Sequence, residues 1–125
     1  MHTHNKYCIT LSIVACVFLL IGCGQGQTSS YGRAIENRSP VDTATILQDP
    51  HNFTGKTVTV QGEIIRECPA GGWFDLKSTN GAFYVDLHPS DFAIPQKVGK
   101  TVLVEGEIKV ENNKPKMIGK GVEIQ

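Results

Sequence analysis

The chain has 125 residues, and its twelve lysines and arginines balance twelve aspartates and glutamates, so the formal net charge is zero. This length allows one compact domain at most. A neutral charge gives no support to electrostatically driven nucleic-acid binding, which needs a basic face that displaces counterions.

The first 22 residues have the plan of a secretory signal peptide. The amino terminus and Lys6 precede an apolar run over residues 9–21, which ends at Gly22 and is followed by Cys23. A charged start, a short apolar stretch and a small residue at the cut are typical of such peptides. A membrane-spanning helix is the alternative, but spanning needs roughly 20 apolar residues. We therefore expect an exported protein.

The four residues Leu20-Ile21-Gly22-Cys23 resemble the lipobox of bacterial lipoproteins. The resemblance implies cleavage before Cys23 and acyl chains on that cysteine, so that the membrane is one partner of the protein. By the same resemblance, Gly24 in place of an aspartate favours the periplasmic face of the outer membrane, in an organism that has one. Cleavage would also remove Cys8 and Cys16, which leaves Cys68 as a single unpaired thiol.

The segment that follows contains glycine, glutamine, serine and threonine, with almost no large apolar side chain up to Ser39. Such a composition cannot bury enough surface to offset its ordering entropy. We predict a lipidated cysteine and flexible linker over 23–40, and one folded domain over 41–125.

The domain begins with a short helix in this interpretation. Ser39 or Asp42 can cap it, and Ala44, Ile46 and Leu47 give it an apolar face. Pro50 ends it, because the residue before a proline avoids the helical region.

Two nearly identical decamers predict two strands. Residues 55–64 read GKTVTVQGEI and residues 99–108 read GKTVLVEGEI. In each, small or apolar residues alternate with a period of two, which is typical of half-buried strands. The internal glycines indicate bends or bulges. We interpret the repeat as two strands under the same geometric demand, since the sequences after the decamers diverge.

Three further strands are expected. Residues 73–77 and 82–87 flank Asn80-Gly81, a strong hairpin signal. The last strand, over 116–124, follows a turn at 111–115 and places Ile118, Val122 and Ile124 on one face. The connector over 89–98 has room for one helical turn at residues 90–93.

This pattern is typical of an oligonucleotide/oligosaccharide-binding (OB) barrel, which has five strands. The stretches ILQDPHNFTGKTVTVQGEI and GGWFDLKSTNGAFYVDL resemble the opening and the central hairpin of the anticodon-binding-like branch of that superfamily. The resemblance covers residues 44–124 and implies an all-β, five-stranded Greek-key barrel. A small open β-sandwich is the structural alternative.

The segment ECPAGGWF around Cys68 resembles that of small uncharacterised envelope OB proteins, which carry two cysteines before a tryptophan. Here Gly72 takes the place of the second cysteine. Cys68 lies at the tip of the first predicted hairpin, and His88 follows the third strand at the same end of the sheet. Together they are candidate ligands for a soft metal, copper or zinc, with Met117 as a conceivable thioether. Packing is the alternative role for Cys68, because free cysteines are often buried.

Aromatic residues cluster on the central hairpin. Alternation places Phe83 in the core and Tyr84 outside, and it turns Trp73 and Phe74 to opposite faces. OB modules stack bases or sugars on aromatic side chains of this surface. Trp73 and Tyr84 are therefore candidate ligand-binding residues, and closure of the barrel end is the alternative role for Trp73.

No catalytic arrangement emerges, since the histidines lack a serine or cysteine partner pattern and no phosphate-binding glycine motif is present. Asp75 and Asp86 share the predicted hairpin, where carboxylates are common. We expect a lipid-anchored, non-catalytic binding or assembly module of the envelope, with an envelope protein partner and no cofactor. Metal or thiol handling by Cys68 and His88, and a passive structural subunit, are the alternatives.

Overall fold

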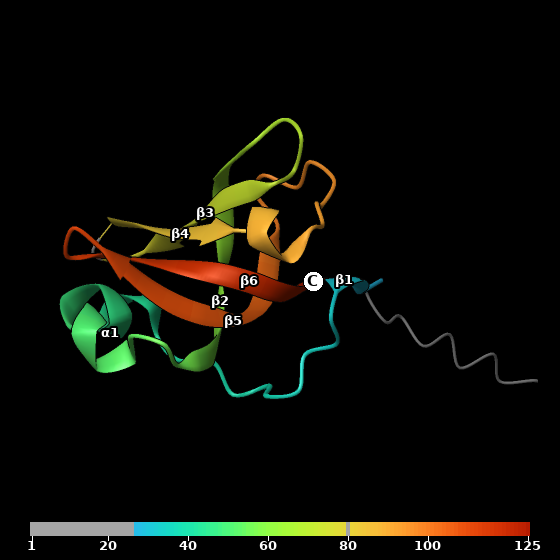
Figure 1. The fold of residues 1–125 in the computed structure, drawn as a ribbon. Helices are drawn as coiled ribbons and strands as arrows, with labels where there is room; N and C mark the ends of the chain where they lie inside the picture. Colours follow the sequence, from blue (N-terminus) through green and yellow to red (C-terminus); the bar gives the residue numbers. More distant parts are fainter. Residues whose placement is uncertain (1–26, 80) are drawn as a thin grey trace, which may run out of the picture.

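A computed structural model describes residues 27–79 and 81–125 of the chain (Figure 1). The predicted signal peptide, Cys23, Gly24 and Asn80 lie outside the described residues. Among the residues described, no helix is both long and apolar enough to cross a membrane.

Strands dominate the fold. They are β1 (Ser29–Gly32), β2 (Thr57–Glu67), β3 (Trp73–Ser78), β4 (Gly81–Asp86), β5 (Thr101–Glu111) and β6 (Lys114–Ile124). One α-helix, α1 (Thr43–Gln48), and two 3₁₀ turns, η1 (Pro50–Phe53) and η2 (His88–Ser90), complete it.

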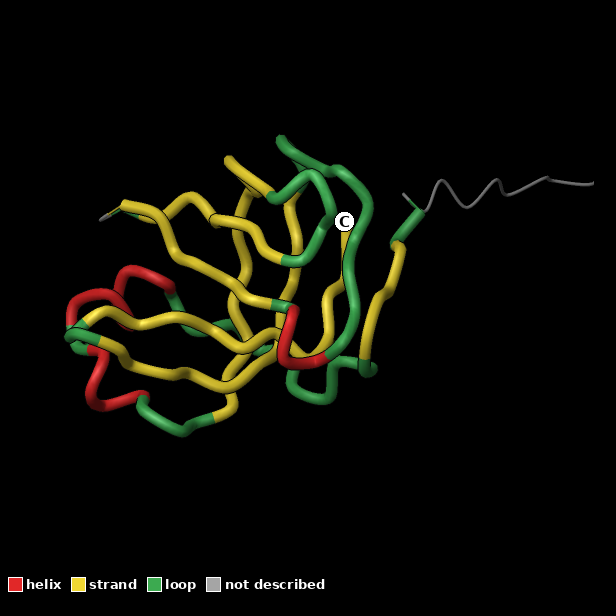
Figure 2. The backbone as a smooth tube through the Cα atoms, turned by 45° about the horizontal axis from the view of Figure 1, so that its top comes forward, coloured by secondary structure: helices red, strands yellow, loops and turns green. Residues whose placement is uncertain are grey.

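Five strands close into a barrel in the order β2-β3-β4-β6-β5, and β5 pairs back onto β2. All of these pairings are antiparallel except that of β4 with β6. Figure 2 shows the strands curving around one interior. This is the arrangement of an OB barrel, so the predicted all-β, five-stranded class is confirmed and the open sandwich is wrong.

The interior is filled by apolar side chains from every barrel strand. Ile46 of α1 and Leu87, directly after β4, join them, and the largest fully buried side chains are Phe74, Phe83, Ile46, Ile64, Leu76, Leu87, Ile108 and Met117. At about 25 cal/mol per Å² of buried apolar surface, this core is the main stabilising contribution to the fold.

Helix α1 covers one end of the barrel, beside β4 and β6. Asp42 caps it, with its carboxylate accepting a hydrogen bond from the Ala44 N–H at 2.9 Å. Pro50 begins η1 directly after the helix. Of the two predicted caps, Ser39 and Asp42, the structure uses Asp42, and the predicted end at Pro50 and apolar face at Ile46 are confirmed.

The two decamers lie side by side as β2 and β5 and are related by a local two-fold axis. The axis passes between Val60 and Val104, which are register partners. The contacts at both ends match: the Gly55 N–H donates to the Ile108 carbonyl and the Gly99 N–H to the Ile64 carbonyl, each at 2.8 Å. The two strands are antiparallel neighbours that line the same interior, so both need side chains of the same size and polarity at matching positions. This shared packing requirement explains the repeat.

A β-bulge in β6 changes which residues in the first half of the strand point into the core. Gly121 pairs with Glu105 and Gly119 with Gly106, so that Lys120 is the extra residue. The prediction that Ile118 shares a face with Val122 is therefore wrong. Met117 lies in the core, where Ile118 was expected, and Ile118 is only partly buried.

The N-terminal segment, residues 29–41, is part of the domain. Strand β1 pairs with residues 121–124 of β6, and the Asn37 N–H donates to the Glu105 carboxylate at 2.9 Å. Arg38 forms two hydrogen bonds with Glu123, of 2.7 and 2.8 Å. The structure thus differs from the predicted flexible linker, because main-chain pairing and polar contacts hold the segment while its apolar side chains Tyr31 and Val41 pack against the core.

The connector from β4 to β5 has its helical turn at η2, two residues before the predicted turn, and Asp91 ends η2 in the left-handed conformation, at φ 57°. Glu67 at the end of β2 holds the far end of the connector, since its carboxylate accepts hydrogen bonds from the Lys97 and Val98 N–H groups.

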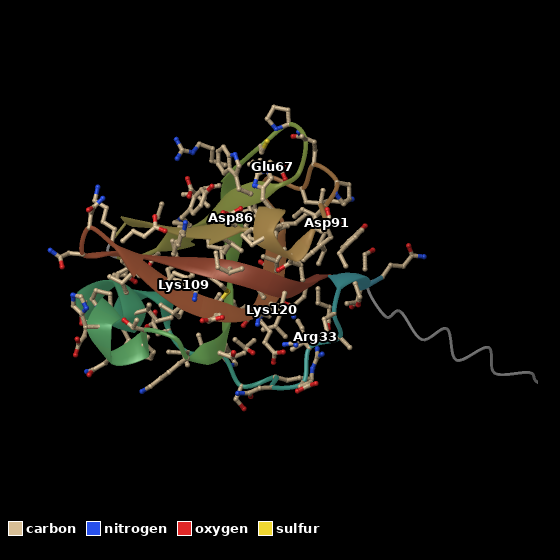
Figure 3. The ribbon with its side chains drawn as sticks, viewed as in Figure 1. Arg33, Glu67, Asp86, Asp91, Lys109 and Lys120 are labelled. Atoms are coloured by element: carbon tan, nitrogen blue, oxygen red, sulfur yellow. The ribbon has the colours of Figure 1, made fainter. Side chains whose placement is uncertain are left out.

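Figure 3 shows Glu67, Asp86 and Asp91 in the upper half of the molecule, and Arg33 and Lys120 in its lower half.

Candidate functional site

The outward face of the β3–β4 hairpin carries the candidate ligand-binding residues. Register pairs Trp73 with Asp86 and Asp75 with Tyr84, so these four side chains share one face. The opposite face of the hairpin is turned to the core. The outward assignment of Tyr84 and the inward one of Phe83 are confirmed.

Trp73 and Tyr84 form an aromatic pair. Their ring centroids lie 5.7 Å apart with the planes tilted by 32°, and both side chains are half-buried. The guanidinium carbon of Arg66, from β2, lies 5.5 Å from the centroid of the Trp73 ring. A stacked pair and a cation–π contact both restrict ring motion. The structure therefore holds two rings in place while leaving part of each exposed.

Asp75 anchors Arg66 in this position. The Arg66 Nε lies 2.8 Å and one terminal nitrogen 2.6 Å from Asp75 Oδ2. The Asp75 side chain is 6% exposed, whereas that of Arg66 is 70% exposed. The carboxylate is thus covered, and the outer surface of the guanidinium stays available beside Trp73.

The Tyr84 hydroxyl sits in a setting that favours its neutral form. Partial burial, followed by the negative charge of Asp86, raises the pKa of Tyr84 above its ordinary value of 10.0. The phenol therefore remains a hydrogen-bond donor well into the alkaline range.

A groove of about 430 Å³ adjoins Tyr84, and residues from α1, β4 and the β5–β6 turn line it: Leu47, Ala82, Tyr84, Glu111, Asn112, Lys114, Pro115 and Lys116. The turn is of the I′ type, since Asn112 and Asn113 both have positive φ, 52° and 61°. In OB barrels the loops after the first and fourth barrel strands flank the ligand surface. Here those loops are residues 68–72 and the β5–β6 turn.

Cys68 and His88 belong to segments that meet at Gly72. Cys68 is half-buried in the β2–β3 loop, and its N–H donates to the Trp73 carbonyl at 3.0 Å. The His88 ring lies against Gly72, and its Nδ1 is 2.9 Å from Asp86 Oδ1. Met117 is fully buried in the core, which removes it from any thioether role at this loop. Soft-metal binding by Cys68 and His88 stays a prediction.

No group of three or more His, Cys, Asp or Glu side chains able to hold a metal ion occurs in residues 27–79 and 81–125.

Sequence reasoning missed Arg66 as a member of the site. Ile64 points into the core, so strict alternation turns Arg66 inward as well. A bulge between Ile64 and Arg66 makes Ile65 the extra residue, exposes it by 43% and sends Arg66 outward to Asp75. An arginine two places from a buried isoleucine, with an aspartate on the next strand, is the signal that was available.

No protein-family model matches the chain, and no curated protein matches it. Its structure is similar to one titled "Structure of the hypothetical protein ygiW from E. coli", at 19% sequence identity and a TM-score of 0.50, covering 70% of this chain and 90% of that one. At this identity the likeness shows the fold alone. It supports an OB-type domain.

Proposed function

We propose that this protein is a lipid-anchored, non-catalytic binding module of the cell envelope, with the outward face of the β3–β4 hairpin as its ligand surface. The observation that carries the proposal is the Trp73–Tyr84 pair, held beside Arg66 and partly open to solvent. The lipobox resemblance at Cys23 supports the anchor.

Rigid, half-exposed rings favour ligands with flat faces, because stacking then costs little ordering entropy. The strands involved are the second and third of the barrel, which OB modules use for oligosaccharides and oligonucleotides. Their position supports a ligand site over a purely structural role for Trp73.

Charge separates these two ligand classes. Two carboxylates, Asp75 and Asp86, share the face of the aromatic pair with one exposed guanidinium, Arg66, which is already paired with Asp75, and the chain as a whole is neutral. Carboxylates repel a phosphate backbone but accept hydrogen bonds from sugar hydroxyl groups. We infer that the surface binds neutral sugar rings of an envelope oligosaccharide.

Trp73 is the chain's single tryptophan, so its fluorescence reports directly on this surface. We expect a saturable change in that fluorescence when the mature protein is titrated with an N-acetylated chito-oligosaccharide, and no comparable change with single-stranded DNA. Calorimetry with Tyr84→Ala should show a Kd raised by about fivefold or more, since one stacked ring contributes roughly 1–3 kcal/mol.

Tyr84→Phe keeps the ring and should bind nearly as well as the wild type. Tyr31→Ala removes an aromatic ring from β1 instead and serves as the matched control. A Trp73 fluorescence that does not change when the sugar is added contradicts the proposal, and so do equal affinities for Tyr84→Ala and Tyr31→Ala.

A further inference from the structure

We propose that the groove between β4 and β6 binds an extended peptide, which adds to the free edge of β4 as a further strand. This goes beyond the proposed sugar-binding surface, because the groove borders the Tyr84 ring but the peptide would be held by backbone groups of β4.

The pairing of β4 with β6 ends early. It comprises Val85 with Met117 and Asp86 with Ile118. Among the described residues, Ala82–Tyr84 pair with β3 alone and Lys114–Lys116 with β5 alone. These unpaired halves of the two strands line the groove of about 430 Å³. The barrel therefore has an open seam at this point, and the groove occupies it.

The backbone of β4 presents a row of free groups to the seam. The Leu87 N–H donates to the Gly72 carbonyl at 2.9 Å, which turns the Leu87 backbone toward the β3 side. Backbone groups in an antiparallel strand alternate between its two edges. The N–H and C=O groups of Tyr84 and Ala82 therefore point away from β3. In the parallel pair of Val85 with Met117 the Tyr84 C=O faces the Met117 N–H, so the Tyr84 N–H and both backbone groups of Ala82 are the ones left to the seam.

The β6 side explains why the seam stays open. The Ile108 N–H donates to the Lys56 carbonyl, so the Ile108 backbone points to β2 and its register partner Met117 points away from β5. By the same alternation Pro115 points into the seam. Proline has no N–H to give to a neighbouring strand. Strand β6 therefore cannot continue its ladder along β4.

A strand edge is complemented by another extended polypeptide, whose N–H and C=O groups repeat at the same spacing. Charge adds a preference. Lys116 forms an ion pair with Glu111 at 3.1 Å, whereas Lys114 has no carboxylate partner among the residues described. We infer an extended peptide segment of an envelope protein that carries an acidic side chain opposite Lys114.

The probe is a peptide selected from a phage-displayed random dodecamer library with the mature protein as bait, then synthesised. We expect it to contain an acidic residue and to slow amide hydrogen exchange at Ala82 and Tyr84. Two further versions of the peptide are synthesised, one with N-methyl groups on the odd-numbered residues and one with N-methyl groups on the even-numbered residues. Each version lacks the backbone donors along one edge and keeps all of its side chains. One of these should bind about tenfold more weakly or worse, the effect of losing a net hydrogen bond or more.

Ala82→Pro is the matching change in the protein. It removes an N–H that faces the seam and leaves the ladder with β3 intact, so peptide affinity should fall by a similar factor. Ala82→Ser keeps the N–H and should bind like the wild type. Circular dichroism checks the fold of both variants, and the N-methylated peptides carry the test alone if Ala82→Pro does not fold.

Failure to select any peptide, equal binding of all the N-methylated and parent peptides, or exchange protection away from β4 overturns the inference. Trp73→Ala separates it from the proposed function. This variant should lose the chito-oligosaccharide and still bind the peptide, so either proposal can fail without the other.

Discussion

At the scale of single residues, the glycines of the two decamers show how equivalent positions acquire different roles. Gly62 and Gly106 occupy the same place in the repeat. A Cβ at Gly62 would lie 3.3 Å from the Leu76 Cβ, a tight but adjustable contact. A Cβ at Gly106 would overlap the Ile118 carbonyl oxygen and lie 2.7 Å from the Met117 side chain. Strand β6 therefore packs more tightly against Gly106 than β3 does against Gly62.

Alanine substitutions at these two positions should differ in effect. We expect Gly106→Ala to lower the free energy of unfolding by about 1–3 kcal/mol, because backbone atoms must move apart in a packed interior. Gly62→Ala should stay within about 1 kcal/mol of the wild type, since the loss of unfolded-state freedom offsets the tighter packing. Urea unfolding of both variants measures the difference. Equal destabilisation contradicts the assigned packing.

At the scale of elements, the N-terminal segment gives β5 and β2 unlike surroundings. The decamers differ at Thr59 against Leu103 and at Gln61 against Glu105, and register places Thr59 opposite Glu105 and Gln61 opposite Leu103. All four lie on the outward face, while the inward residues are identical. Glu105, 3% exposed, accepts its hydrogen bond from the N-terminal segment. Packing inside the barrel thus accounts for the identical inward residues, and contact with the N-terminal segment accounts for the differences on the outward face.

Attachment of this segment should weaken in acid. The hydrogen bond from Arg38 lowers the pKa of Glu123 below its ordinary value of 4.5. A carboxylate whose folded pKa is lowered stabilises the fold above its unfolded pKa, and this contribution is lost as the pH falls through the folded pKa. We expect Glu123→Gln to lower the Tm at pH 7 and to match the wild type near pH 3.

Thermal unfolding of both proteins between pH 7 and pH 3 checks this expectation. Glu63→Gln, at an exposed position of β2 for which no ion pair is found in the described part of the chain, is the control and should leave the Tm unchanged throughout. A Tm difference between wild type and Glu123→Gln that persists at pH 3 contradicts the assignment.

At the scale of the whole molecule, the docked N-terminal segment shortens the expected tether. The linker was predicted to extend to residue 40, but Ser29 already pairs with Ile124. Six residue steps separate Cys23 from Ser29, and an extended chain spans at most about 3.6 Å per residue, so the reach is on the order of 20 Å. Under the proposed lipid anchor at Cys23, the barrel would be held close to the membrane surface.

Replacement of the predicted lipid site tests this arrangement. Full-length protein expressed in a bacterial host should incorporate labelled palmitate and fractionate with membranes. Cys23→Ser should incorporate none and leave the membrane fraction, because the acyl chains supply the attachment. Cys68→Ser, the matched cysteine variant, should behave like the wild type. Unlabelled wild-type protein with an intact leader, detected by mass spectrometry, rules the anchor out.

The amino-acid sequence by itself determined the features that depend on local chemistry: a capped helix start at Ser39 or Asp42, the end of the helix at Pro50, the hairpin turns and the inward face of the decamers. Turn residues and period-two alternation act over a few residues, so they can be read without knowing the fold. Tertiary structure alone decided the rest. Bulges at Ile65 and Lys120 reverse the facing of Arg66 and Ile118, and a polar N-terminal segment docks through main-chain pairing. Both depend on the neighbouring strand, which is distant in the sequence or paired in a register that no local pattern specifies.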